Sequence, residues 1–397
     1  RSYYFYKMQN TDDYETDNLY RNDGSSFTRV TEEAGLRTYG LTLSATIGDL
    51  NNDSYPDIYI SNDFSSPDFM YMNNGDGTFS ESVKETTNQT SFYGMGVDIA
   101  DFNNDSYLDY IQVDMDAKDN RRSKANMASM NPDLFWSTVN YGFHYQYMHN
   151  TLQLNRRIEG DKPFFSNISR LSGISSTDWS WGPLLADLDN DGWKDLFISN
   201  GIRREINHRD FFNEIKLRPM SNDSLLYYTE QMPSEAIANF TFKNNTDLTF
   251  TDVSESWGLD QKNFSNGATY ADLDNDGDLE LIVNNVDQEA QIYRNNSKNN
   301  YLKVKLKGSD QNPIGIDSRV FVKTSDNNQM QELTLSRGFQ SSVSTYLNFG
   351  VGNEEIIESV KVLWPDGKTE QLNNVEANTT IEFDIKNSRI EALDDEK

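Results

Sequence analysis

The 397-residue sequence contains no cysteine and only three histidines. Without cysteine, thiolate metal sites, thiol catalysis and disulfide scaffolds are excluded. No apolar run approaches the roughly 18 residues of a membrane-spanning helix, so the sequence predicts no transmembrane segment. It also lacks a Gly-x-Ser-x-Gly elbow and a phosphate-binding glycine loop. We therefore expect a protein that is not an enzyme.

Basic residues are few, because 35 Lys and Arg stand against 63 Asp and Glu, which gives a net charge of −28. A surface this acidic repels phosphate backbones and anionic lipid headgroups, so we expect no nucleic-acid partner. High net charge with low hydropathy is also typical of disordered chains. The 22 Phe, 21 Tyr and 6 Trp argue against disorder, and we expect a folded chain that uses its acids for a specific purpose.

Four nine-residue segments repeat one acidic pattern, with Asp at positions 1 and 5, Asp or Asn at position 3, and Asp or Glu at position 9. Small or apolar residues precede each segment, and a short β-type run follows it. The pattern therefore predicts a strand, an acidic turn and a second strand. We call these segments turns one to four, in chain order: residues 49–57, 101–109, 187–195 and 272–280.

A second repeated element alternates with the acidic turns. Asn, Asp and Gly residues, as in 22–24 and 74–77, lie between apolar runs and are strong hairpin signals. Two hairpins per unit make a four-stranded blade, and blades in series make an all-β propeller. Because one blade takes about 40–50 residues, the longer intervals between turns two, three and four predict insertions near 114–150 and 201–240.

The pattern of polar and apolar residues changes near residue 299. Lys alternates with Leu and Val in residues 302–306, and similar runs continue to residue 385, which is the pattern of half-buried strands. We therefore assign residues 1–298 to the propeller blades with their insertions, residues 299–386 to a small β-sandwich-like domain and residues 387–397 to a flexible acidic tail.

Each acidic turn predicts a cluster of side-chain oxygens around one point. Carboxylates about 4 Å apart repel by about 4 kcal/mol per pair at an effective dielectric constant of 20, so the arrangement is favourable only with a cation inside. Oxygen ligands without His or Cys favour Ca²⁺, and we predict up to four calcium ions. Side chains at positions 1, 3, 5 and 9 and the backbone carbonyl at position 7 form the predicted ligand sets: Asp49, Asn51, Asp53, Tyr55 and Asp57; Asp101, Asn103, Asp105, Tyr107 and Asp109; Asp187, Asp189, Asp191, Trp193 and Asp195; Asp272, Asp274, Asp276, Asp278 and Glu280.

Two alternatives compete with this assignment. Asp and Asn also favour plain solvated β-turns, but four copies in matched context favour a shared function. EF-hands are excluded because a β-type run rather than a helix follows each turn, and no Glu stands at position 12.

The four turns differ in composition. Turns one and two offer three carboxylates each and turns three and four offer four each, so we expect the latter pair to bind calcium more tightly. At position 6, Gly192 and Gly277 adopt a positive φ freely, whereas Ser54 and Ser106 would do so at some cost.

Two groups outside the turns are candidates for ligand recognition. Trp136, Tyr141 and Tyr145 lie in an aromatic stretch that suits stacking on sugar rings or a protein hot spot; the alternative is that it packs the first insertion onto the blades. Arg203 and Arg204 form a basic cluster suited to a carboxylate or an anionic glycan; the alternative is pairing with neighbouring acids.

The acidic turns resemble the FG-GAP or VCBS repeats of integrin-α-type propellers. The C-terminal segment, with its Asn300-Tyr301-Leu302, Leu347-Asn348-Phe349-Gly350 and Leu363-Trp364-Pro365-Asp366-Gly367 motifs, is similar to the ASPIC/UnbV domain. This pairing is typical of CRTAC-like VCBS proteins, and residues 177–181 and 199–204 resemble their large surface-associated members in Bacteroidota. The resemblance implies a seven-bladed propeller in the complete protein, with repeats upstream of Arg1, calcium in the turns and an exported location.

From the residues and the resemblance together, we expect a calcium-binding propeller outside the cell or at a bacterial outer-membrane surface, with a lipid anchor upstream of Arg1 as one option. We expect it to act as a binding or scaffold module for a protein partner at that surface. The alternative is a lectin-like, carbohydrate-binding module, or an accessory protein of glycan utilisation, that uses the aromatic stretch.

Overall fold

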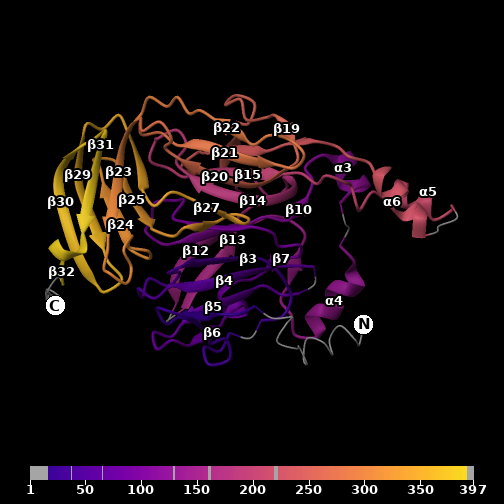
Figure 1. The fold of residues 1–397 in the computed structure, drawn as a ribbon, viewed down its shortest axis with the longest axis horizontal. Coiled ribbons are helices and arrows are strands. Elements are labelled where there is room, and N and C mark those ends of the chain that lie inside the picture. The colour runs from indigo at the N-terminus through magenta and orange to yellow at the C-terminus, as the bar shows by residue number, and fades with distance from the viewer. Residues whose placement is uncertain are drawn as a thin grey trace.

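The computed structural model describes residues 17–390, apart from residues 37, 65, 128–129, 160–161 and 219–221. Strands dominate the described chain, and its helices are few and short (Figure 1). The all-β class expected from the repeats is therefore confirmed. Within the described residues, no helix is both long enough and apolar enough to cross a bilayer.

Four antiparallel sheets follow one another along the chain as propeller-like blades. Within each blade the strands pair in chain order, and the third blade carries an extra strand, β10 (Met115–Asp116), beside its first. The first blade comprises β3 (Leu41–Gly48), β4 (Asp57–Asp63), β5 (Phe69–Asn73) and β6 (Phe79–Glu81); the second, β8 (Val97–Ala100), β9 (Asp109–Gln112), β12 (Thr151–Glu159) and β13 (Lys162–Asn167); the third, β14 (Asp178–Ala186), β15 (Asp195–Asn200), β17 (Phe240–Asn244) and β18 (Phe250–Asp252); the fourth, β20 (Ser265–Ala271), β21 (Glu280–Asn285) and β22 (Gln291–Tyr293).

Each acidic turn connects the first two strands of a blade. In every blade, the position-9 residue pairs with the residue directly before position 1, as Ala186 does with Asp195 and Ala271 with Glu280. The predicted order of strand, acidic turn and strand is therefore confirmed. All four turns stand in the same register on their blades.

Shorter strands complete this part of the molecule. A hairpin precedes the first blade, a parallel pair joins the start of the second blade to its insertion, and an antiparallel pair precedes the fourth blade. These elements are β1 (Tyr20–Asn22) with β2 (Phe27–Arg29), β7 (Thr90–Ser91) with β11 (Gln146–Tyr147), and β16 (Ile237–Ala238) with β19 (Lys262–Asn263); the short helix α2 (Val83–Thr86) follows the first blade.

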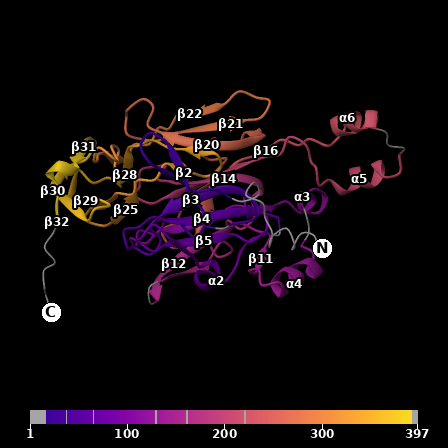
Figure 2. The same cartoon turned by 60° about the horizontal axis from the view of Figure 1, so that its bottom comes forward.

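The longer helices lie within the two segments predicted as insertions. The first segment contains α3 (Asn120–Ala125) and α4 (Pro132–Asn140), and the second contains α5 (Arg209–Ile215) and α6 (Asn222–Glu230). Helices α5 and α6 project from the blades as an arm (Figure 2).

Arg122 in α3 ties the two insertions together. Its buried guanidinium pairs with Asp178 at the start of β14 and with Glu205 and Glu235 of the second insertion. The insertions are therefore anchored to each other as well as to the third blade.

Apolar side chains fill the space between neighbouring blades. In β14, Leu185 joins the core shared with the second blade, and Leu184 joins the core shared with the fourth. This alternation follows from strand geometry, because successive side chains point to opposite faces of a sheet. Burial of such surface, at about 25 cal/mol per Å² of apolar area, holds the blades side by side.

Two sheets pack face to face in the C-terminal part and form the expected sandwich. Val304 and Phe349 from one sheet and Val322 and Val360 from the other share one buried core. The first sheet contains β23 (Asn300–Lys307), β28 (Leu347–Gly352) and β31 (Thr379–Asp384); the second contains β24 (Arg319–Lys323), β25 (Asn328–Glu332), β29 (Ile356–Leu363), β30 (Lys368–Glu376) and β32 (Arg389–Ile390), with a 3-10 turn at Ile385–Asn387.

The C-terminal tail begins later than the sequence indicated. Residue 387 was expected to open the flexible tail, but β32 still pairs with β30 at Arg389 and Ile390. A buried hydrogen bond from Trp364 Nε1 to Ser388 Oγ (2.7 Å) holds this end on the sandwich. The rest of the expected tail lies outside the described residues.

A hairpin of the sandwich domain, β26 (Ser336–Arg337) with β27 (Ser341–Ser342), reaches between the blades (Figure 1). It contacts β3, β8, β14 and β20, the first strands of all four blades. Gly338 exchanges two backbone hydrogen bonds with Val97, at 2.9 and 3.3 Å, and Arg337 Nη1 donates to Asp98 Oδ1 at 2.9 Å. The sandwich is therefore anchored where the first strands converge.

The substitution Arg337→Met tests this anchor. Arg337 and Asp98 are both buried, so loss of the guanidinium leaves a buried carboxylate without its counter-charge. We expect the free energy of unfolding to fall by about 3–5 kcal/mol, measured by urea denaturation. Lys368→Met breaks a half-exposed ion pair with Asp366 and should cost less than about 1 kcal/mol. Equal effects of the two substitutions would contradict a buried anchor.

Candidate functional site

The four acidic turns share one internal hydrogen-bond pattern. The carboxylate at position 1 accepts a hydrogen bond from the backbone N–H of position 6 in every turn, at 2.7–3.1 Å. The carboxylate at position 5 accepts one from the N–H of position 7, at 2.8–3.4 Å. The residue types at positions 1 and 5 thus determine how each turn folds locally.

The carboxylate at position 9 joins each turn to the rest of its sheet. It accepts from the N–H of position 2, at 2.7–3.4 Å, and from the backbone N–H of an Asn in or just after the third strand, at 2.7–3.2 Å. The sequence analysis did not assign these asparagines to the site, although one recurs in every copy of the second repeated element. They are Asn73, Asn155, Asn244 and Asn295.

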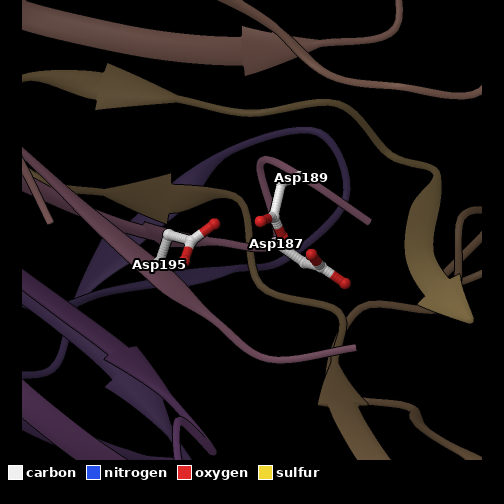
Figure 3. Close-up of side chains that lie close together, drawn as sticks. All are labelled: Asp187, Asp189 and Asp195. Atoms are coloured by element: carbon white, nitrogen blue, oxygen red, sulfur yellow. The ribbon is translucent and has the colours of Figure 1, made fainter. Parts of the chain in front are cut away.

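Turn three brings three carboxylates together. One oxygen each of Asp187, Asp189 and Asp195 lie within 4.8 Å of one another, and Figure 3 shows two of them on the loop and the third at the start of β15. Oδ1 of Asp189 is buried and has no hydrogen-bond partner. Carboxylates this close repel each other unless a cation lies between them, so turn three fits a divalent cation held by oxygen.

Turn four forms two such groups, which share Asp276. One adds Asp272 and Asp274, and the other adds Asp278 and Glu280. Oδ1 of Asp272 and Oδ1 of Asp278 are buried without a hydrogen-bond partner. Buried acceptors without donors are rare in folded proteins, and a bound cation would satisfy both. Position 7, expected to supply only its carbonyl, therefore also offers its side chain in this turn.

Among the described residues, neither turn one nor turn two forms a group of three carboxylates within 4.8 Å of one another. Their position 3 is Asn, and in turn one Asn51 Nδ2 bonds Asp53 Oδ2 at 2.8 Å. In turn two, Oδ1 of Asn103 is buried without a partner. Tighter calcium binding in turns three and four stays a prediction, and this geometry favours it.

Burial raises the pKa values of several buried turn carboxyls. It raises the pKa of Asp57 to about 8 and those of Asp101 and Asp187 to about 7. Burial, together with a shared hydrogen bond to Asp276, raises the pKa of Asp278 to about 7. The charged form of these groups is therefore disfavoured without a cation, and a bound cation would restore it.

Basic side chains that the sequence analysis did not assign to the turns already pair with some of these acids. Lys243 in β17 pairs with Asp189 and Asp191 of turn three, and Arg294 pairs with Asp274 of turn four at 2.8 Å. Lys243 lies in the third strand of its blade and Arg294 directly follows the third strand of its own, so both approach their turn from the neighbouring strand.

Two basic side chains of the sandwich domain also pair with turn carboxylates. Lys303 Nζ lies 2.7 Å from Asp272 Oδ2, and Arg319 Nη2 lies 2.7 Å from Asp49 Oδ2. All four side chains are largely buried in the interface between propeller and sandwich. The partners are 31 residues apart for Lys303 and 270 residues apart for Arg319, and neither pair lies within one local motif, which is why local patterns did not indicate them.

Position 6 adopts the left-handed conformation in all four turns. The φ angles are 70° at Ser54, 67° at Ser106, 92° at Gly192 and 94° at Gly277, so both serines accept the conformation that glycine adopts most readily. Gly277 has a second reason to be glycine, because a Cβ there would lie 1.9–2.2 Å from ring atoms of Tyr301. Glycine is thus required where the sandwich packs onto turn four.

The aromatic candidates form an exposed surface at α4. Trp136 is 56 % exposed, Tyr141 62 % and Tyr145 44 %. The ring of Phe135 contacts those of Trp136 and Tyr145, with centroids 5.2 and 6.2 Å apart. This exposure favours recognition over the packing alternative for these three residues.

The basic candidates are internally paired. Arg203 binds Asp287 and donates to Ser234 Oγ, and Arg204 Nη1 donates to the carbonyl of Met232 at 3.2 Å. The structure therefore favours the pairing alternative over an open anion site.

Comparison with known proteins agrees with this architecture. Residues 49–111 match the FG-GAP-like repeat, and residues 308–390 match the family described as ASPIC and UnbV. The chain thus contains an FG-GAP-like repeat and an ASPIC/UnbV domain in a propeller-like, all-β fold, as the resemblance of its motifs implied. The matched families are not known as enzymes.

The chain is also homologous to cartilage acidic protein 1. It is 24 % identical to the Mus musculus protein over 361 residues, which cover 87 % of this chain and 46 % of that protein. The Homo sapiens protein is 24 % identical over 364 residues, covering 89 % and 46 %. The chain thus spans about half the length of these relatives. The attribution to Bacteroidota stays a prediction.

The raised pKa values predict an unusual pH dependence for calcium-free protein. Between an unfolded-state pKa near 4 and the folded values of about 7 to 8 for Asp57, Asp101 and Asp187, the folded state binds more protons than the unfolded state. The free energy of unfolding should therefore fall as the pH rises from about 5 to 8. Melting temperatures of dialysed protein across this range measure the effect.

Calcium should counteract this fall in the free energy of unfolding with rising pH, because it binds deprotonated carboxylates. The stabilisation by about 10 mM CaCl₂ should therefore grow from pH 5 to pH 8. A calcium effect that is equal at both ends of the range would show that the buried turn carboxyls are not the ligands.

Proposed function

We propose that this chain is a calcium-binding, propeller-like module that acts outside the cell, without enzymatic activity, as a binding or scaffold unit in a protein assembly. The observation that carries this proposal is the grouping of carboxylate oxygens in turns three and four, several of them buried without a hydrogen-bond partner. The predicted ligand atoms of these turns are all oxygens, which is the ligand chemistry that calcium prefers.

Calcium would be held by the side chains at positions 1, 3, 5 and 9 and by the carbonyl at position 7. It would supply the positive charge that Asp187 and its neighbours lack. The chain's own residues do the rest: backbone N–H groups orient the carboxylates at positions 1, 5 and 9, and the strands on either side keep each loop in register. Calcium would then stabilise the turn that connects the first two strands of a blade.

An extracellular location fits the expected strength of such sites. Extracellular calcium modules bind with Kd of about 10⁻⁴–10⁻³ M, and the net charge of −28 matches the acidic character in the relatives' name, cartilage acidic protein 1. We extend an extracellular or cell-surface location to this chain on these grounds, with the bacterial outer-membrane surface as one such setting.

A scaffold role fits the shape of the molecule. The sandwich is anchored on the propeller through a buried hairpin, and the arm of α5 and α6 projects outward (Figure 2). Leu217 and Tyr227 on the arm are exposed, and exposed apolar residues on a projecting element suit contact with a protein partner.

Calcium should raise the melting temperature, and one altered turn should reduce the number of ions bound. At 100 times its Kd, each site adds about 2.7 kcal/mol to the free energy of unfolding. Asp191→Asn removes the position-5 carboxylate that all four turns carry, so we expect one ion fewer in isothermal titration calorimetry.

Asp247→Asn is the matched control, because Asp247 lies in an exposed hairpin outside the acidic turns. This variant should bind as many ions as the unaltered protein. An unchanged melting temperature in EGTA, together with no heat of calcium binding, would rule out the calcium function.

The second candidate function is carbohydrate binding at α4. It is favoured by the exposure of Trp136, Tyr141 and Tyr145 and by the contacts of Trp136 and Tyr145 with the ring of Phe135, because flat aromatic rings stack on the apolar faces of sugars. The surface would then serve a lectin-like or glycan-utilisation role beside the calcium turns.

Trp136→Ala tests this candidate on a glycan array in calcium buffer. We expect bound glycans to lose at least about tenfold in affinity, which corresponds to about 1.4 kcal/mol. Tyr227→Ala, an exposed aromatic on the arm, should leave glycan binding unchanged. An array without binding to folded, calcium-loaded protein would leave the protein-partner role.

A further inference from the structure

We propose that neighbouring turns bind their cations as a coupled series, linked by the Asn at position 4 of each turn. The inference rests on the proposed calcium function and concerns how the sites influence one another. It assigns a positioning role to residues that are not themselves in the predicted ligand sets.

The position-4 asparagines of turns one, two and three each reach the next turn along the chain. The side-chain Nδ2 of each donates a hydrogen bond to the carbonyl oxygen at position 6 of that turn. Three successive links therefore run from turn one to turn four. The donor and acceptor pairs are Asn52 to Ser106 (3.3 Å), Asn104 to Gly192 (2.9 Å) and Asn190 to Gly277 (3.1 Å).

On the donor side, position 4 lies between two predicted ligands, positions 3 and 5. Its backbone is left-handed in every turn, with φ between 56° and 62°. A cation that orders positions 3 and 5 therefore also fixes the direction in which the intervening Asn side chain points. Asn190, between Asp189 and Asp191 of turn three, is the best-buried example.

On the acceptor side, the linked carbonyl belongs to the peptide group that joins positions 6 and 7. The N–H of this same peptide donates to the position-5 carboxylate, as Asp278 N does to Asp276 Oδ1 at 3.4 Å. The link to Gly277 therefore acts on a peptide that lies between two predicted ligands of turn four. Ordering one turn thus lowers the cost of ordering the next.

A second bridge runs in the opposite direction. Nδ2 of Asn295 donates to the carbonyl of Leu188, position 2 of turn three, and to that of Leu279, position 8 of turn four. The backbone N–H of Asn295 bonds Glu280, position 9 of turn four. Asn155 and Asn244 repeat this arrangement between the earlier turns.

The three hydrogen bonds between neighbouring turns differ in how far the sandwich domain shields them from water. Asn348 Nδ2 donates to Gly277 O at 3.2 Å and to Asn190 Oδ1 at 3.4 Å, and this link is buried. The link from Asn52 is exposed and is the longest of the three. Hydrogen bonds shielded from water are electrostatically stronger, so we expect the largest coupling between turns three and four.

The coupling is measured by comparing the calcium Kd of turn four with and without a working turn three. Asp53→Asn with Asp105→Asn disables turns one and two and leaves two sites to titrate with calcium. In this background, Asp191→Asn, the same position-5 change, disables turn three, and its effect on the calcium Kd of turn four gives the coupling factor. Allosteric couplings of this kind amount to about 5–150-fold, and we expect a factor in that range.

Asn190→Gly should reduce the coupling factor to near one. Glycine keeps the left-handed backbone at no steric cost and removes only the side-chain amide, without any change of charge. Asn275→Gly is the matched control, because Asn275 holds position 4 of turn four with φ 61° and the sandwich, rather than a fifth acidic turn, follows it. This control should leave the factor unchanged.

The outcomes separate the inference from the proposed function. If no variant and no unaltered protein binds calcium, the proposed function fails and the inference fails with it. If calcium binds but the factor is near one, or survives Asn190→Gly, only the coupling is wrong. Near-UV circular dichroism checks folding, and Asn104→Gly repeats the test between turns two and three if Asn190→Gly does not fold.

Discussion

Burial of carboxylates against backbone N–H groups is the constraint on which this architecture depends. Each acidic turn places one carboxylate where it organises the loop, and another, at position 9, where it holds the third strand of the same blade. The acids are therefore structural before any cation is considered. The same burial makes their charge costly, which raises the pKa of Asp187 to about 7 and creates the need for a counter-charge. Basic side chains placed at the turns meet part of that need.

Part of the counter-charge comes from the sandwich domain. Arg319 and Lys303 reach turns one and four, and Arg337 reaches the buried Asp98 between the blades. Breaking such buried pairs is far more costly than breaking surface pairs, so propeller and sandwich are joined by mutual neutralisation as well as by packing. Glycine at position 277 belongs to the same interface, because Tyr301 of the sandwich occupies the space of a side chain there.

Local patterns in the sequence were sufficient for the turns, the blades and the sandwich, because each depends on residues close together in the chain. Asp and Asn at fixed spacing determine the turns, and alternation of apolar residues determines the strands. The hairpin at residues 336–342 could not be predicted in this way, since its partners, Val97 and Asp98, lie more than two hundred residues earlier. The same holds for Arg319, whose partner Asp49 lies 270 residues earlier. Ser54 and Ser106 show the reverse case, in which a local preference was overridden because the turn's hydrogen bonds determine φ.

The four turns differ in how the sandwich covers them. In turn one, Asp49 and Asp57 are buried but residues 52–55 are exposed, and Arg319 of the sandwich pairs with Asp49. Turns three and four carry four carboxylates each and glycine at position 6, and the sandwich lies directly against both. Covering an acidic loop removes the water that would stabilise it, so charge is costly at the carboxylates that the sandwich covers. The sandwich therefore shapes the candidate cation sites of the propeller, both by excluding water and by placing basic side chains beside the acids.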